Sequence, residues 1–450
     1  MDERSEAGGG TPNGELTTHT ASLSGPTLLS WSYNRDDLGR ITRITESNGT
    51  TVYARDFAYD PAGRLISVTE DGELVEAYSY DANGNRLSTL NSAGVFQATY
   101  DAQDRIQSFG DVEYIFTPNG NLALRRDTTN NTVTTYDYDA LGNLRTVGLP
   151  NGDVLEYLVD AQGRRVGKAR NGVLEQGWLW RGQLQPIAQL DGSGNVVARF
   201  VYAGQSNVPE LVVTAGATYR LVKDHLGSVR MVVDTATGEL VQELQYDAWG
   251  RVLVDTNPGF QPFGYAGGFY DAETGLVRFG ARDYDAEIGR WTAKDPIGFG
   301  GTTNRYEYAR SRPTFARDPL GLQDAATVDE VIQYLPFVLP TIGPVLSAIG
   351  GACVEAAPYA AAAAAVAIAG YEAYELANEW DTTTLVDAVE ADVGAVCVEV
   401  QVCGPLDPPL DRDECVRDCG WAHLIGMLSE RGYQNCVEMC LSSPPGGPPN

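Results

Sequence analysis

The chain has 450 residues, with 60 acidic and 32 basic side chains and a formal net charge of −28. This excess of negative charge argues against nucleic acid or an anionic membrane surface as a binding partner, because both would repel the chain. Glycine is abundant at 50 residues, and 23 tyrosines outnumber 12 phenylalanines, which is typical of a β-rich chain with many tight turns. The length is ample for roughly two to four domains.

Residues 1–26 form a polar segment rich in Gly, Thr and Ser. The segment has no apolar run of the kind that a secretory signal peptide requires. We therefore expect a disordered leader. Two explanations stay open: an export route that needs no such signal, or a truncated gene product.

Residues 27–223 are dominated by a repeated motif, Tyr-Asp-x-x-Gly followed by Arg or Asn. Successive copies begin 16 to 22 residues apart, which indicates a repeat architecture. The copies are Tyr59–Leu65, Tyr80–Arg86, Tyr100–Arg105, Phe116–Asn121, Tyr138–Asn143 and Val159–Arg164, with looser copies starting at Leu190, Lys223 and Tyr246. Within each turn the Asp can close an Asx turn, and the Gly supplies a left-handed residue.

A second turn signal lies between copies of the motif, at Asp71-Gly72, Asn151-Gly152 and Asn171-Gly172. Both residues of such a two-residue turn need positive φ. Around Asp71-Gly72, apolar residues alternate with polar ones, as in half-buried antiparallel strands. We therefore predict one hairpin per repeat, stacked edge to edge into a β-shell, with the motif tyrosines in one layer. A purely structural role is favoured for this region.

Residues 224–322 carry short motifs in a fixed order. They are Asp224–Arg230, Phe269–Leu276, Arg282–Asp285, Gly289–Trp291, Asp295–Gly298, Asn304–Tyr308 and Asp318–Leu322. The series resembles the RHS repeat-associated core of bacterial RHS, wall-associated and insecticidal-toxin C proteins. With the upstream repeats, the resemblance covers roughly residues 30–322. The sequence departs from the family pattern at Ala286, where Pro is frequent, and at Asp283, where an aromatic residue is common.

The resemblance implies a closed β-shell, a core that plugs one end of it, and a variable C-terminal effector that is cut free inside. In the family an intramolecular aspartyl peptidase cuts just after the leucine of the Asp-Pro-x-Gly-Leu motif. Carried onto this sequence, the catalytic residues are Arg282, Asp295 and Asp318. The scissile bond then joins Leu322 to Gln323. With about 300 residues of shell, this chain is expected to build only part of a cage.

The chemistry of such a site is consistent with these residue types. Peptide hydrolysis needs one ionised carboxylate to activate water and one protonated carboxyl to polarise the carbonyl. Two adjacent carboxyls share a proton, and Arg282 would hold one of them ionised. No cofactor or metal is expected, since the three histidines, His19, His225 and His423, are dispersed. The alternative is that both Asp-Pro-x-Gly segments are ordinary type I turns.

Residues 323–450 differ from the rest of the chain, with 19 acidic and 3 basic side chains and all seven cysteines of the protein. We expect a mainly α tail. The hydrophobic segment 331–371 combines two uncharged runs, separated by Glu355, and carries three prolines in the first, which argue against a straight membrane helix. It is either a linker packed inside the shell or a membrane-inserting segment.

The Cys-rich segment 397–440 ends in two pairs of cysteines, each spaced by four residues. Residues four apart share a helix face, so a helical hairpin would bridge Cys415 to Cys440 and Cys419 to Cys436. Gly432 interrupts the second helix, and a zinc site is the rival interpretation. Disulfides would imply an oxidising destination.

The sequence thus predicts a mainly β protein: a partial shell of stacked antiparallel hairpins, a core, and a mainly α tail as cargo. The leading hypothesis is an exported, self-processing scaffold of a bacterium. Its expected partners are its own tail, a cognate immunity protein or secretion-system component, and a target membrane. Two alternatives stay open: a non-enzymatic surface or adhesion protein, and a toxin whose tail carries unrecognised chemistry. No known enzyme motif occurs in the tail.

Overall fold

The computed structural model describes residues 6–10, 16–22, 27–204, 206–298 and 303–322. Several predictions made from the sequence lie outside these residues. They concern Gln323, the tail 323–450 with its helices, the hydrophobic segment 331–371, and the disulfide candidates Cys415, Cys419, Cys436 and Cys440. No helix in the described ranges is long and apolar enough to span a bilayer.

The described residues form mainly β structure, as predicted. A 24-stranded sheet runs as an antiparallel meander in which each strand pairs with the next along the chain. Its strands are β1 (Glu6–Gly10), β2 (Leu16–Ser22), β3 (Thr27–Arg35), β4 (Ile41–Ser47), β5 (Val52–Tyr59), β6 (Leu65–Glu70), β7 (Glu73–Tyr80), β8 (Arg86–Asn91), β9 (Gly94–Tyr100), β10 (Ile106–Phe109), β11 (Val112–Phe116), β12 (Leu122–Asp127), β13 (Thr132–Tyr138), β14 (Leu144–Gly148), β15 (Val154–Val159), β16 (Arg165–Arg170), β17 (Val173–Arg181), β18 (Gln185–Asp191), β19 (Val196–Val201), β20 (Leu211–Val213), β21 (Thr218–Lys223), β22 (Val229–Asp234), β23 (Leu240–Tyr246) and β24 (Val252–Asp255). The prediction of one hairpin per repeat is confirmed.

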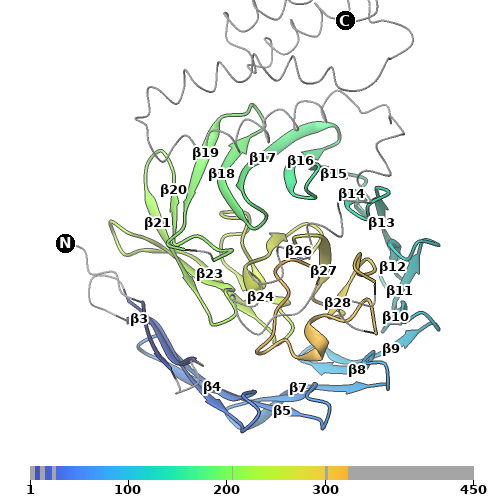
Figure 1. Ribbon diagram of the computed structural model, residues 1–450, viewed down its shortest axis with the longest axis horizontal. Helices are drawn as coiled ribbons and strands as arrows, with labels where there is room; N and C mark the ends of the chain where they lie inside the picture. Colours follow the sequence, from blue (N-terminus) through green and yellow to red (C-terminus); the bar gives the residue numbers. More distant parts are fainter. Residues whose placement is uncertain (1–5, 11–15, 23–26, 205, 299–302, 323–450) are drawn as a thin grey trace, which may run out of the picture.

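A second, four-stranded sheet lies inside the curve of the first, as Figure 1 shows. Its strands are β25 (Phe269–Asp271), β26 (Leu276–Phe279), β27 (Arg282–Asp285) and β28 (Arg290–Trp291), accompanied by the short 3-10 helices η1 (Tyr265–Gly267) and η2 (Ala309–Ser311). The large sheet begins with the blue strands β3–β9 and continues through β10–β16 to the green strands β17–β23. The core segment from β25 onward is therefore surrounded by the strands that precede it.

The repeat turns share one set of hydrogen bonds, which we call their hydrogen-bond frame and which explains the positions of Asp, Gly and Arg in the motif. The turn at Asp60 illustrates it. The Gly63 amide donates to the Asp60 carbonyl at 2.9 Å, and the Arg64 amide donates to Asp60 Oδ1 at 2.9 Å. The Arg64 side chain then donates from Nε to Asp60 Oδ2 at 2.7 Å. Gly63 has a φ of 83°, which explains the glycine of the motif. The same backbone frame recurs at Asp36, Asp81, Asp101, Asp139, Asp160, Asp191, Asp224 and Asp247.

The motif tyrosines form the predicted layer. In four copies of the motif, the tyrosine hydroxyl donates to a backbone carbonyl near the start of a preceding strand, which ties one repeat to the one before it. These bonds run from Tyr59 to Ile41 at 2.5 Å, from Tyr80 to Leu65 at 2.6 Å, from Tyr100 to Arg86 at 2.9 Å and from Tyr246 to Val229 at 3.1 Å. The ring is thus buried while its one polar atom stays hydrogen-bonded.

Three predictions about boundaries and turns are wrong. Residues 6–10 and 16–22, predicted to lie in a disordered leader, form β1 and β2. Three threonines favour a strand in β2, Ala21 is fully buried against β3, and β1 pairs with β2. The large sheet continues to Asp255, past the boundary predicted at residue 223, because β22–β24 extend the meander. Asn151 does not have positive φ. Pro150 starts a longer turn there, and only Gly152 is left-handed, at 93°.

The core segment docks on the repeat turns through hydrogen bonds from its own side chains. The contacts join Asn304 to Asn85 at 2.8 Å, Tyr306 to the Gly120 carbonyl at 2.8 Å, and Arg278 to Asn143 at 3.0 Å. Beneath them, four large aromatic side chains with at most 1% exposure pack together: Phe279, Tyr284, Trp291 and Tyr308. This packing fixes the hairpin formed by β26 and β27, on which the candidate site is built.

Candidate functional site

Arg282, the first residue of β27, lies at the centre of the predicted site and is 3% exposed. Its Nη2 atom lies 2.9 Å from Asp295 Oδ2 and 3.2 Å from Asp318 Oδ2. Because both carboxylates contact the same nitrogen, their Oδ2 atoms can be no farther apart than the sum of these two distances. The structure therefore brings together all three residues predicted to be catalytic.

The remaining contacts of the Arg282 side chain hold it in place from other directions. Nε donates to the Gly321 carbonyl, and Nη1 donates to the Arg305 carbonyl at 3.2 Å. The guanidinium also lies over the Trp291 ring, 4.1 Å from its centroid. A planar, permanently charged group with five donors suits this arrangement, in which it bridges two carboxylates and two carbonyls.

Asp318 begins a turn with the frame of the repeats. The Gly321 amide donates to the Asp318 carbonyl at 3.2 Å, and the Leu322 amide donates to Asp318 Oδ1 at 3.0 Å. The residue four positions after the aspartate is Leu322 rather than Arg, so Asp318 Oδ2 is left for Arg282. Leu322 is 5% exposed and is the last described residue. Its amide thus lies directly against one carboxylate of the dyad.

Gly321 is required by a close approach of two backbones. It has a φ of 64°, and a Cβ atom there would lie 2.4 Å from the Phe279 carbonyl oxygen. The Ala281 amide donates to the Leu320 carbonyl at 2.9 Å on the same side. The glycine of the Asp-Pro-x-Gly-Leu motif therefore lets the end of the core lie flat on the β26–β27 hairpin.

Asp295 also begins a turn, in which Ile297 donates to Oδ1 and Gly298 donates to the carbonyl, both at 3.0 Å. The residue is 8% exposed. Burial raises the pKa of Asp295 above its ordinary value, although the Arg282 charge acts in the opposite direction. Asp295 is therefore suited to carry a proton.

Sequence reasoning missed two parts of the site. Trp291 lies in the Gly289–Trp291 motif, so the motif signalled its importance but not its position over Arg282. The backbone of Phe279–Ala281 packs against the Leu320–Leu322 segment. In the sequence, only Gly280 could have indicated this close contact. In the described ranges, no group of three or more His, Cys, Asp or Glu side chains is arranged to hold a metal ion.

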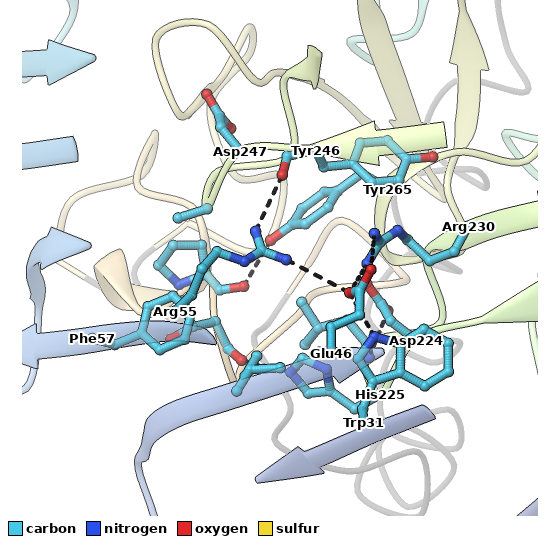
Figure 2. Close-up of a pocket in the computed structure, with 15 residues that line it drawn as sticks. Trp31, Glu46, Arg55, Phe57, Asp224, His225, Arg230, Tyr246, Asp247 and Tyr265 are labelled. Atoms are coloured by element: carbon cyan, nitrogen blue, oxygen red, sulfur yellow. Dashed lines mark hydrogen bonds and ion pairs between the residues drawn. The ribbon is translucent and has the colours of Figure 1, made fainter. Parts of the chain in front are cut away.

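A second polar cluster lies elsewhere, around a cavity of about 50 Å³ that Figure 2 shows between the first strands and the β22–β23 region. Arg230 forms two hydrogen bonds of 2.9 Å to Glu46, and Arg55 lies 3.9 Å from the same carboxylate. His225 hydrogen-bonds the Thr314 carbonyl at 2.7 Å, and burial lowers its pKa. None of the three predicted catalytic residues lines this cavity. Its ion pair joins Glu46 of β4 to Arg230 of β22, two residues that are 184 positions apart in the sequence.

Comparisons with known proteins find several similar chains. Teneurin-3 of Danio rerio is 31% identical over 281 residues, which cover 60% of this chain and 10% of the teneurin. The toxin protein Tse5 of Pseudomonas aeruginosa is 28% identical over 377 residues, which cover 69% of this chain and 28% of the toxin. The crystal structure of TcdB2-TccC3-TEV is 19% identical with a TM-score of 0.38, over 70% of this chain and 20% of that one.

The chain thus spans about a tenth of the length of the teneurin and less than a third of Tse5. The family described as Teneurin YD-shell matches residues 12–314, which is more than half of the chain. The matched region includes nearly all of the large meander, the repeat turns and most of the core segment. This chain belongs to the Teneurin YD-shell family.

Proposed function

We propose that this protein is a shell scaffold that cuts itself once, after Leu322, and so releases residues 323–450 as an effector. One observation carries the proposal: a single nitrogen of the buried Arg282 contacts both Asp295 and Asp318. The Asp318 turn also holds Leu322, the residue before the proposed cut, against the same carboxylate. A dyad, a guanidinium and a peptide segment held in cis are the components that such a reaction needs.

The proposed chemistry uses only side chains of this chain and one water molecule. The two carboxyls share a proton, and Asp295 is its favoured holder because burial raises the pKa of that residue. Ionised Asp318 removes a proton from water, and the water oxygen bonds to the Leu322 carbonyl carbon. Asp295 hydrogen-bonds the carbonyl oxygen and then protonates the Gln323 nitrogen as the C–N bond breaks. Arg282 remains charged and keeps Asp318 ionised.

The position of the proposed cut relative to the shell supports the release of an effector. The large sheet curves around the β26–β27 hairpin, against which the Leu320–Leu322 segment is held, so the proposed cut lies at the end of the enclosed core. Tse5, a relative, is a toxin protein, which supports an effector role for the released segment. An exported effector of this kind would require a cognate immunity protein in the producing bacterium and a secretion-system component for delivery.

A second candidate function is a non-enzymatic structural or adhesion protein of the cell surface. The observation that favours it is the hydrogen-bond frame of the Asp318 turn, which is the frame of the purely structural repeat turns. Under this interpretation Asp295 and Asp318 only shape the end of the core, and Arg282 only neutralises them.

The intact mass of the purified full-length chain separates these functions. Self-cleavage predicts two fragments, residues 1–322 and residues 323–450, and the smaller one should begin at Gln323 when its N-terminus is sequenced. A single species of the full mass, stable over days between pH 4 and pH 8, would favour the structural function. A cut at another bond would show an external protease.

A further inference from the structure

The β26–β27 hairpin carries most of the contacts that form the proposed cleavage site. Arg282 projects from it toward the dyad, and the Ala281 amide holds the Leu320 carbonyl at 2.9 Å. The Phe279 carbonyl oxygen packs so closely on Gly321 that no side chain would fit between them. The position of this hairpin therefore determines whether Leu322 and the two aspartates meet.

The opposite side of the same hairpin is anchored to the shell by a buried charge cluster. Asp283, the neighbour of Arg282 on β27, is 1% exposed and accepts hydrogen bonds of 2.9 Å from both Arg165 and Arg278. Arg165 belongs to shell strand β16, whereas Arg278 belongs to β26. Arg165 also lies over the Tyr157 ring, 3.6 Å from its centroid, so the shell holds this guanidinium rigidly.

Adjacent residues of a strand point to opposite sides, so the side chains of Arg282 and Asp283 make contacts on opposite sides of β27. Arg282 faces the dyad, and Asp283 faces the shell. Arg278 adds a second link, because its Nη2 donates to Asn143 at 3.0 Å and to the Gly163 carbonyl at 3.1 Å. Both acceptors lie in repeat turns of the shell.

We propose that Arg165 is a positioning residue for the cut: through Asp283 it fixes the β26–β27 hairpin, so that the cleavage site is complete only when the shell is packed on the core. This inference rests on the proposed self-cleavage. It gives the reaction a built-in condition, because the chain would release its C-terminal segment only after the shell has formed around the core. Asp283 is the residue that makes this link.

The charge balance of the cluster indicates which substitution to test. Asp283→Asn would leave two buried guanidiniums without a carboxylate and is expected to impair folding. Arg165→Gln instead leaves the Asp283–Arg278 pair and the Arg278 contacts to the shell intact, and removes only the direct bond from Arg165 to Asp283. Arg170→Gln is a matched control, because Arg170 is also on β16 and also contacts the core, at Glu273, but in a more exposed place remote from Arg282.

The experiment follows cleavage of the full-length chain after cell-free synthesis, with dilution into buffers of different pH. Arg165→Gln should be cut about 10 to 100 times more slowly than wild type, because small misplacements of reacting groups have effects of this size. The alkaline limb of its pH–rate profile should move to higher pH, since a displaced Arg282 no longer lowers the pKa of Asp295, the proposed general acid. Arg165→Lys should restore part of the rate, and Arg170→Gln should be cut normally.

Thermal unfolding in an Asp318→Asn background, which stays uncut, provides the folding control. Arg165→Gln that remains folded and is cut at the wild-type rate with an unshifted profile would overturn the inference while leaving the proposed function intact. Equal slowing of Arg165→Gln and Arg170→Gln would also overturn it, because general destabilisation would then be sufficient. A wild-type chain that is never cut would overturn the proposed function itself, and this inference with it.

Discussion

The turns at Asp60 in the shell and at Asp318 in the core share two hydrogen bonds, one to the aspartate carbonyl and one to its Oδ1, but differ in the residue four positions after the aspartate. In the shell turn, Arg64 occupies the position four residues after the aspartate and binds both its carboxylate oxygens, one through the amide and one through Nε. In the core turn that position is Leu322, which contributes only its amide. The second oxygen of Asp318 is then available to Arg282, from a distant strand.

This difference shows how a structural repeat can become a reactive site. A carboxylate whose two oxygens are both bound within its own turn is a local cross-link and has no capacity for chemistry. At Asp81 and Asp139 an asparagine replaces the arginine and binds the same oxygen, whereas at Asp318 the leucine cannot, and this oxygen contacts Arg282 instead. Asp295 follows the same rule in part, with Oδ1 bound to the Ile297 amide and Oδ2 directed to Arg282.

The strongest test of this comparison exchanges the aspartates themselves. Asp295→Asn and Asp318→Asn should each slow the cut by about a thousandfold or more, because each removes one member of a proton-sharing pair without changing its shape. Asp60→Asn, the matched change in a shell turn, should be cut normally. Mass spectrometry measures the fragments, and circular dichroism checks the β structure. Normal cutting of either dyad variant would refute the dyad assignment.

A second test converts the core turn into a shell turn. In Leu322→Arg the new guanidinium should bind Asp318 Oδ2 in competition with Arg282 and slow the cut by about a hundredfold. Leu322→Gln is the control, because it is polar but has no guanidinium, and it should be less impaired. Gln323→Ala should matter less than either change. If the Arg and Gln variants were cut equally slowly, local competition for the carboxylate would be ruled out as the cause.

A third test asks whether a raised carboxyl pKa is enough to identify a site. Burial, with a contribution from Asp247, raises the pKa of the shell residue Glu76 to about 7. Because the folded-state pKa is above the unfolded one, the protonated form stabilises the fold. That stability is fully present below about pH 4.5 and is lost as the pH rises through about 7.

Glu76→Gln mimics the protonated form and should therefore remove this pH dependence. At pH 8 the variant should be more stable than wild type by an amount on the order of 2 kcal/mol, and near pH 4.5 the two should be similar. Denaturant unfolding of both proteins in the uncut Asp318→Asn background measures the difference. The rate of cutting should not change. Parallel stability curves from pH 4.5 to pH 8 would contradict the prediction.

The smallest effect is expected in the shell turn itself. Arg64→Gln removes a partly exposed ion pair with Asp60 and should lower the free energy of unfolding by about 1 kcal/mol or less. The cut should be unaffected. A loss of several kcal/mol, measured by urea unfolding, would show that the repeat arginines contribute much more than local cross-links, and the contrast between the two kinds of turn would be weaker than proposed.

Much of the shell could be predicted from the sequence because its determinants are local. The frame of the repeat turn lies within five residues, from Asp60 to Arg64, so the motif specifies the turn wherever it occurs. Alternating apolar residues then specify the paired strands. The prediction failed where the local signal was weak, as in the threonine-rich residues 16–22, or was overridden by a neighbour, as at Asn151 beside Pro150.

The candidate site was predicted in part and by a different route. Arg282, Asp295 and Asp318 followed from the resemblance of ordered motifs, and not from any spacing that places them together. Their contact depends on three segments that meet only after the core has folded inside the shell.

The sequence by itself determined the repeat turns, the hairpins and the tyrosine layer, since each depends on residues close along the chain. The tertiary structure alone decided which distant charges meet. Glu46 and Arg230 are 184 residues apart, and Arg165 and Asp283 are 118 apart, yet both pairs are buried at 2.9 Å. Such pairs form because the curvature of the large sheet brings remote strands together, and a buried charge must then find a partner of opposite sign.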